Sequence, residues 1–139
     1  MSFAYWVKVN NAWSENWRDG IRWYSTNGSS DTYSRQEFYT NCTKVGVWFA
    51  GSPNSISGKT FTVGEWHHLA FTIDYTLGRA DFYIDGALAG YTTGVSTDHY
   101  LKTGNFILGD SDGAGVDINM NDVRIYNHCL SAAEVKEIS

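Results

Sequence analysis

The sequence predicts an all-β fold: an antiparallel β-sandwich of the jelly-roll type that ends in a short α-helix. Along most of the chain, apolar and polar residues alternate with a period of two, which is typical of strands. Turns containing Gly, Asn and Asp separate these segments, and only the last ten residues have a helical period. Many short strands divided by such turns indicate a sandwich or a jelly roll. The length of 139 residues fits one domain, so we assign residues 1–139 to a single domain.

The alternation is clearest in segments 3–8, 21–24, 44–49 and 68–73. Several of them carry bulky or apolar residues on both faces, which predicts that the outer face of the sandwich is also partly covered or used. Asp85-Gly86 lies between two further strand segments and predicts a two-residue hairpin, since both turn positions favour positive φ. Residues 10–19 have no clean period and are predicted to form a long loop.

The predicted helix lies at residues 130–139. Ser131 is a good N-cap, and Glu134 three residues later completes a capping box that satisfies two backbone donors. Leu130 before the cap and Val135 after it are placed to form a hydrophobic staple.

Composition and charge exclude two classes of partner. The net charge is −5 and no basic run exists, which excludes a nucleic-acid-binding protein. No apolar run approaches the ~18 residues of a membrane-spanning helix, so we expect no membrane insertion. The first residues lack the pattern of a signal peptide. This predicts either a protein made inside the cell, such as a virion component, or a domain taken from a longer chain.

Two cysteines, Cys42 and Cys129, lie far apart in the sequence. Two cysteines in a domain of this size do not make a disulfide scaffold. We expect both to be free, because Cys129 lies among small residues of the buried type; a single long-range bridge is the alternative.

Several segments resemble motifs of the laminin G-like jelly roll in the concanavalin A-like lectin/glucanase superfamily. They are AYWVK at 4–8, GEWHHLAFT at 64–72, FYIDG at 82–86, ILG at 107–109, MNDVRIYN at 120–127, and Leu130-Ser131 with Glu134. The resemblance implies a jelly-roll domain that binds glycans or proteins.

The chain departs from the family pattern at two places. The family has a further strand or two before the 4–8 strand, lying beside the final strand, and this chain starts almost on the 4–8 strand. The edge of residues 116–126 is therefore predicted to be unpaired unless a partner chain or a second copy of this chain covers it. Asn121 stands where the family commonly has Asp.

The superfamily's glucanases carry two acids on one strand, spaced as E-x-D-x-x-E. No such motif occurs here, because Glu37, Glu65, Glu134 and Glu137 each lack a suitably spaced carboxylate. We therefore expect no enzymatic activity. The adjacent histidines 67 and 68 point to opposite faces of a strand and cannot jointly hold a metal ion.

An oxygen-rich group surrounds the Gly loop near residue 113. Its members are Asp110, Asp112, Asp117, Asn119 and Asn121. Such ligands suit a hard cation, so Ca²⁺ is the predicted ion. The alternative is that these side chains only cap turns.

The predicted ligand-binding residues lie in the part that least follows the family pattern. They are Trp13, Trp17, Arg18, Trp23, Tyr33, Arg35 and Glu37. Sugars stack on aromatic rings through their C–H groups, and the same composition marks protein interfaces. Trp6, Trp48 and Trp66 lie within strand patterns and are predicted to belong to the core.

These observations predict a non-catalytic recognition module for a glycan or a cell-surface ligand, extracellular or virion-associated. We expect it in a phage virion or tail protein or in a bacterial surface protein. A structural protein that recognises protein partners, for virion decoration or oligomerisation, is a second hypothesis. A glycoside hydrolase is a third, and it would have to act despite the missing acids.

Overall fold

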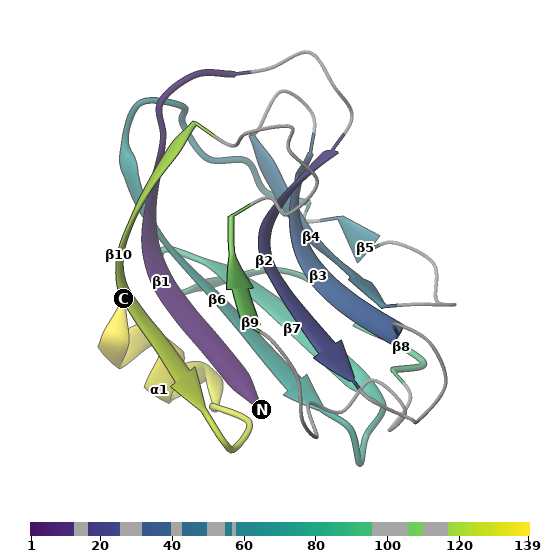
Figure 1. The fold of residues 1–139 in the computed structure, drawn as a ribbon. Helices are drawn as coiled ribbons and strands as arrows, with labels where there is room; N and C mark the ends of the chain where they lie inside the picture. Colours follow the sequence, from purple (N-terminus) through teal and green to yellow (C-terminus); the bar gives the residue numbers. More distant parts are fainter. Residues whose placement is uncertain are drawn as a thin grey trace.

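A computed structural model describes residues 1–12, 17–25, 32–39, 43–49, 55–56, 58–95, 106–109 and 117–139. Within these ranges the chain forms two five-stranded antiparallel sheets and one short C-terminal helix, and the two sheets pack face to face (Figure 1). The predicted antiparallel sandwich with a terminal helix is confirmed. No helix among the described residues is long and apolar enough to cross a membrane.

The sheet that contains the first and the last strand, β1 and β10, is called sheet A here. Its strands, in spatial order, are β10 (Ile118–Tyr126), β1 (Ser2–Val9), β6 (Trp66–Asp74), β7 (Arg79–Ile84) and β8 (Ala87–Thr93). Sheet B consists, in the same way, of β5 (Ser55–Ile56), β4 (Lys44–Phe49), β3 (Thr32–Tyr39), β2 (Trp17–Ser25) and β9 (Phe106–Leu108). Because β2 begins at Trp17, the last part of the predicted loop 10–19 is a strand.

The core lies between the sheets and is built from every second residue of the long strands. On β1 the inward side chains include Phe3 and Tyr5, and both are fully buried. The ring of Trp23 on β2 packs against Phe3 with centroids 4.8 Å apart, so the two sheets meet through aromatic contacts. The Tyr5 hydroxyl donates a hydrogen bond to the Gln36 Oε1, which gives the acceptor of a polar side chain a partner inside this core.

The helix α1 (Ala132–Ile138) packs on the outer face of sheet A. Small residues make room for it, because Ala4 and Ala70 lie side by side on β1 and β6 and are fully buried under the cluster of Leu130 and Val135. The predicted capping box is confirmed: the Glu134 amide donates to the Ser131 Oγ over 3.3 Å, and the Ser131 amide donates to the Glu134 carboxylate over 2.7 Å.

The predicted hairpin turn joins β7 to β8. Asp85 and Gly86 both have positive φ, 51° and 73°. This turn also supports the end of α1, because a Cβ added to Gly86 would lie 2.6 Å from the Ser139 Oγ and 3.3 Å from the Lys136 Cα. Glycine is therefore required at this position both by the backbone conformation and by the approach of the helix.

Strand β10 is the outermost strand in the described part of sheet A and pairs with β1. The pairing contains a bulge: Ala4 is opposite Arg124 and Trp6 is opposite Asn121. Asp122, within the bulge, has φ of 51°, and its carboxylate accepts hydrogen bonds from Arg124. A bulge and charged side chains on an outer strand oppose pairing with a further strand.

A buried ionic network lies on the outward side of sheet B, between β2 and β3. The Arg22 Nε donates to the Asp19 carboxylate over 2.8 Å, and the Arg35 Nε lies 2.5 Å from the Glu37 carboxylate. The Tyr39 hydroxyl also donates to Glu37. Two guanidinium groups thus lie beside two buried carboxyl groups, and such pairing lowers the cost of keeping charges away from water.

Glu37 is the group whose protonation is most affected by this burial. The Glu37 side chain is fully buried, and desolvation raises its pKa from 4.5 to about 7. The positive charge of Arg35 lowers this pKa, and the negative charge of Asp19 raises it. Neighbouring cations only partly offset the cost of burying the carboxylate.

We expect Gly86→Ala to destabilise the domain more than Gly94→Ala. Both positions have positive φ, and a side chain there costs about 1–2 kcal/mol. Only Gly86 faces the helix, since nothing lies within 4 Å of a Cβ at Gly94. The difference should be about 1 kcal/mol in the free energy of unfolding, measured in urea. Equal losses would show that α1 does not rest on this turn.

The folded protein should lose stability as the pH rises from about 4.5 to about 7. In that window folded Glu37 keeps a proton that the unfolded chain releases, because its folded pKa is raised. The loss is on the order of 3 kcal/mol. Glu37→Gln, which cannot titrate, should remove this part of the slope of unfolding free energy against pH. Parallel slopes for the two proteins would contradict the raised pKa.

Candidate functional site

The structure describes the side chains of four of the seven predicted ligand-binding residues. Trp13 and the side chains of Trp17 and Tyr33 lie outside the described residues. Arg18 is half-buried on β2. Arg35 is 9% exposed and belongs to the ionic network of sheet B.

Two of these residues lie away from the surface. Trp23 and Glu37 were expected to contact a ligand, and the structure places both in strands and fully buried. The ring of Trp23 is enclosed by core residues, and the Glu37 carboxylate is held by Arg35 and Tyr39. Neither side chain presents a surface on which a ligand can rest.

Of the predicted calcium ligands, Asp110 and Asp112 lie outside the described residues. The Asp117 carboxylate accepts hydrogen bonds from Asn10 and Asn11, which lower its pKa. The Asn119 amide donates to Asn10 over 3.2 Å. These bonds tie the start of β10 to the end of β1. No group of three acidic, His or Cys side chains that could hold a metal is found in the described ranges. Calcium therefore stays a prediction.

The three tryptophans that were predicted to be core lie on outer faces. Trp66 is 45% exposed, and Trp6 and Trp48 are half-buried. On sheet B, Trp48 carries the Arg35 guanidinium 4.8 Å above its ring. On sheet A, Trp6 and Trp66 belong to neighbouring strands and point away from the core. A position within a strand does not decide between core and surface, because alternate residues of a strand face opposite sides.

Trp6 and Trp66 form the centre of a surface that we call the aromatic face. It consists of Trp6 and Lys8 on β1, Trp66 and His68 on β6, and Asn119 and Asn121 on β10. The register places these side chains in two rows across the strands. Lys8 is flanked by Asn119 and Trp66 in one row, and Trp6 by Asn121 and His68 in the other.

The inner row of the aromatic face is held firmly. Trp6 meets His68 edge-on with ring centroids 5.4 Å apart, and His68 is almost fully buried. Burial lowers the pKa of His68, so this ring is neutral at neutral pH. The Asp85 carboxylate accepts a hydrogen bond from the His68 amide over 2.9 Å and contacts His67 over 2.8 Å.

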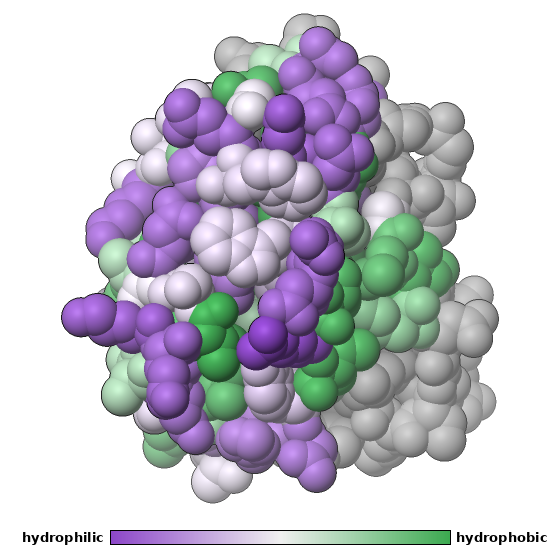
Figure 2. Space-filling view, turned by 90° about the vertical axis from the view of Figure 1, so that its left-hand side faces the viewer, coloured by the Kyte–Doolittle hydropathy of each residue, from purple (hydrophilic) through white to green (hydrophobic). Residues whose placement is uncertain are grey.

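Figure 2 views the molecule from the side of β10 and β1. Pale aromatic side chains of intermediate hydropathy lie there among hydrophilic ones, while apolar side chains form small separate patches. Exposed aromatic rings beside amides and charged groups can bind a ligand that has both an apolar face and hydroxyl groups.

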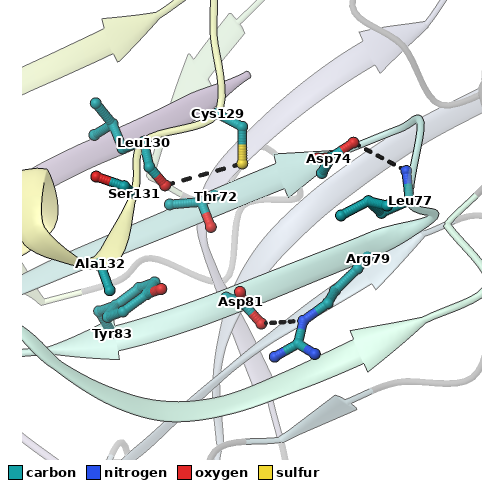
Figure 3. Close-up of a pocket in the computed structure, with 10 residues that line it drawn as sticks. All are labelled: Thr72, Asp74, Leu77, Arg79, Asp81, Tyr83, Cys129, Leu130, Ser131 and Ala132. Carbon is teal, nitrogen blue, oxygen red and sulfur yellow. Dashed lines mark hydrogen bonds and ion pairs between the residues drawn. The ribbon is translucent and has the colours of Figure 1, made fainter.

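A groove of about 380 Å³ lies elsewhere on the outer face of sheet A, between the β6–β7 hairpin and the segment that leads into α1. Figure 3 shows Thr72, Asp81 and Tyr83 below the segment of Cys129 and Leu130. Its volume lies in the range of small-molecule sites.

The charged groups of the groove are already engaged. The Arg79 Nε donates to Asp81 over 2.7 Å, and its guanidinium lies 4.3 Å from the Tyr91 ring centroid. Asp74 caps the hairpin turn through the amides of residues 76 and 77. Cys129 is free, as predicted, but it is exposed; Cys42 lies outside the described residues.

Solved structures with the same fold include lectin-like domains. The chain superposes on a heptameric SAP-like pentraxin from Limulus polyphemus with a TM-score of 0.73 and 15% identity, covering 99% of this chain and 68% of that one. For the CBM40 of Ruminococcus gnavus IT-sialidase the TM-score is 0.70 and the identity is 14%, and the superposition covers 99% of this chain and 80% of that one. For Trypanosoma rangeli sialidase the TM-score is 0.72 and the identity is 16%, and the superposition covers 97% of this chain and 21% of that one. At these identities the likeness concerns the fold.

Two curated plant proteins are also similar in sequence. The calpain-type cysteine protease DEK1 of Arabidopsis thaliana is 31% identical over an alignment of 104 residues, and the match covers 60% of this chain and 5% of that protein. The DEK1 of Zea mays is 28% identical over an alignment of 98 residues, and the match covers 58% of this chain and 4% of that protein. The chain thus spans about one twentieth of the length of these relatives.

The laminin G family model described as the concanavalin A-like lectin/glucanases superfamily matches residues 1–136, nearly the whole chain. The match agrees with the sandwich topology and with the motifs in strands β1, β6, β7 and β10. The chain belongs to the concanavalin A-like lectin/glucanases superfamily.

Proposed function

We propose that this domain is a non-catalytic carbohydrate-binding module whose ligand stacks on the aromatic face. The observation that carries the proposal is the 45% exposed ring of Trp66 beside the half-buried ring of Trp6 on the outer face of three neighbouring strands. A pyranose ring has one apolar face of C–H groups and a rim of hydroxyls. Trp66 and Trp6 suit the apolar face, and the amides of Asn119 and Asn121 suit the rim.

Rigidity of the surface supports this assignment. Trp6 is packed against His68, and the backbone of His68 is bonded to Asp85, so little side-chain freedom is lost when a ligand binds. The CBM40 and the pentraxin, both similar in fold, are consistent with recognition by a sandwich of this kind.

The bonding of two neighbouring acids supports binding without cleavage. Hydrolysis of a glycosidic bond requires one carboxylic acid and one carboxylate on either side of that bond. Near the aromatic face, Asp122 is bonded to Arg124, which lowers the pKa of Asp122. The Asp85 carboxylate is bonded to the two histidines. Both carboxylates are thus already engaged by neighbouring groups. We place the domain where glycans are displayed, on an extracellular or virion surface.

Trp66→Ala should weaken glycan binding by about 10- to 100-fold, because a well-packed aromatic contact contributes roughly 1.4–3 kcal/mol. The measurement is a glycan array of neutral and acidic oligosaccharides, followed by calorimetry with the strongest binder.

Trp48→Ala is the matched control, since it removes a half-buried tryptophan from the outer face of the other sheet. Asp81→Asn tests the groove in the same way. Loss of binding in either of these variants, with Trp66→Ala unchanged, would move the site away from the aromatic face. An array without any binder would refute the proposed function.

A further inference from the structure

We infer that the aromatic face takes an extended, neutral oligosaccharide chain that lies across strands β6, β1 and β10 and covers at least two sugar rings. This inference rests on the proposed function and specifies its ligand class. Three features of the surface lead to it: the spacing of the two tryptophans, the open edge of the sheet, and the balance of charge.

The two tryptophans are placed as neighbouring stacking positions. Lys8 is directly opposite Trp66, and Trp6 is directly opposite His68, so Trp6 and Trp66 are diagonal neighbours on adjacent strands. Diagonal positions have Cα atoms roughly 7–8 Å apart, and large side chains reach across part of that distance. Two rings at this separation suit consecutive units of a chain better than a single sugar.

Strand β10 continues the surface in the direction that leads away from Trp66. It lies about 4.8 Å beyond β1 and contributes the amides of Asn119 and Asn121. The Asn121 Oδ1 accepts the Asp122 amide, and the Asn119 Nδ2 donates to Asn10. The bonds described for these two residues thus leave the Asn121 Nδ2 and the Asn119 Oδ1 to meet ligand hydroxyls.

Because β10 is the outermost strand in the described part of sheet A, a chain can run past Asn119 beyond the edge of the sheet. A surface that is open at one end binds an internal stretch of a polymer as readily as its terminus. A pocket closed around a terminal sugar would discriminate between them.

The charges that border the aromatic face favour a neutral ligand. Lys8 and Arg124 are the cations, and Arg124 is bonded to Asp122. Four carboxylates outnumber these two cations. Three of the carboxylates lie beside the two rows of side chains, and they are Asp85, Asp122 and Asp117 at the start of β10. The exposed Glu65, which directly precedes Trp66, is the fourth. Excess negative charge repels uronic or sialic acid units, as does the net charge of −5 of the whole chain.

The test compares chain length and charge with defined probes. Cello-, xylo-, manno- and laminari-oligosaccharides of one to six units serve as neutral chains, and oligogalacturonides and sialyllactose serve as acidic ones. The best neutral series should gain at least about 10-fold in affinity between one and three units and then level off. Acidic probes of equal length should bind at least about 10-fold more weakly at low salt.

Trp6→Ala should remove most of the gain from the additional units, while Trp6→Tyr, which keeps a ring, should restore it. The double variant Asp122→Asn with Glu65→Gln should reduce the difference in affinity between neutral and acidic oligosaccharides. A monosaccharide that binds as tightly as a hexasaccharide, or a preference for acidic probes, would overturn the inference and leave the proposed function standing. Failure of all sugars to bind would overturn both.

Discussion

The register of β1 is the constraint on which the rest of the structure depends. This strand pairs with β6 on one side and β10 on the other, so one residue of slip would exchange its two faces. Its inward residues, such as Phe3 and Tyr5, are fully buried and carry the contact with sheet B. Its outward residues change along the strand, from Ala4 under the helix to Trp6 and Lys8 on the aromatic face. One period-two pattern therefore supplies the core, the helix seat and the aromatic face.

Local sequence signals were sufficient for the elements. The capping box at Ser131 and Glu134 depends on residues three apart, and the turn at Asp85-Gly86 depends on two adjacent residues, so both could be predicted. The period-two alternation of β1 also indicates that Trp6 lies on the outer face of the sheet. Lys8 must point to the surface, and Trp6, two residues earlier, points the same way.

The face on which individual aromatic residues lie was predicted less well. Trp66 was expected in the core and Trp23 at a ligand, but Trp66 is exposed on the outer face and Trp23 is fully buried. Trp23 shares its parity with Ile21, which is fully buried, and that parity was the better guide. The ionic network could not be predicted, because it depends on which strands are neighbours: Asp19 and Arg35 come from β2 and β3 and meet only after pairing. The bulge at Asp122 in β10 likewise arises from the match of two distant strands.

The aromatic face is also coupled to the C-terminal helix through the β7–β8 turn. Gly86 of this turn lies against the last residues of α1, and Asp85 bonds the amide of His68, whose ring supports Trp6. The chain of contacts runs from Ser139 through the turn to the centre of the surface. A domain that binds through exposed rings needs those rings held in place before the ligand arrives, because each ring that must be ordered on binding reduces the affinity. Packing α1 over the small residues Ala4 and Ala70 thus brings the helix against the turn whose Asp85 accepts the His68 amide, and the His68 ring in turn packs against Trp6.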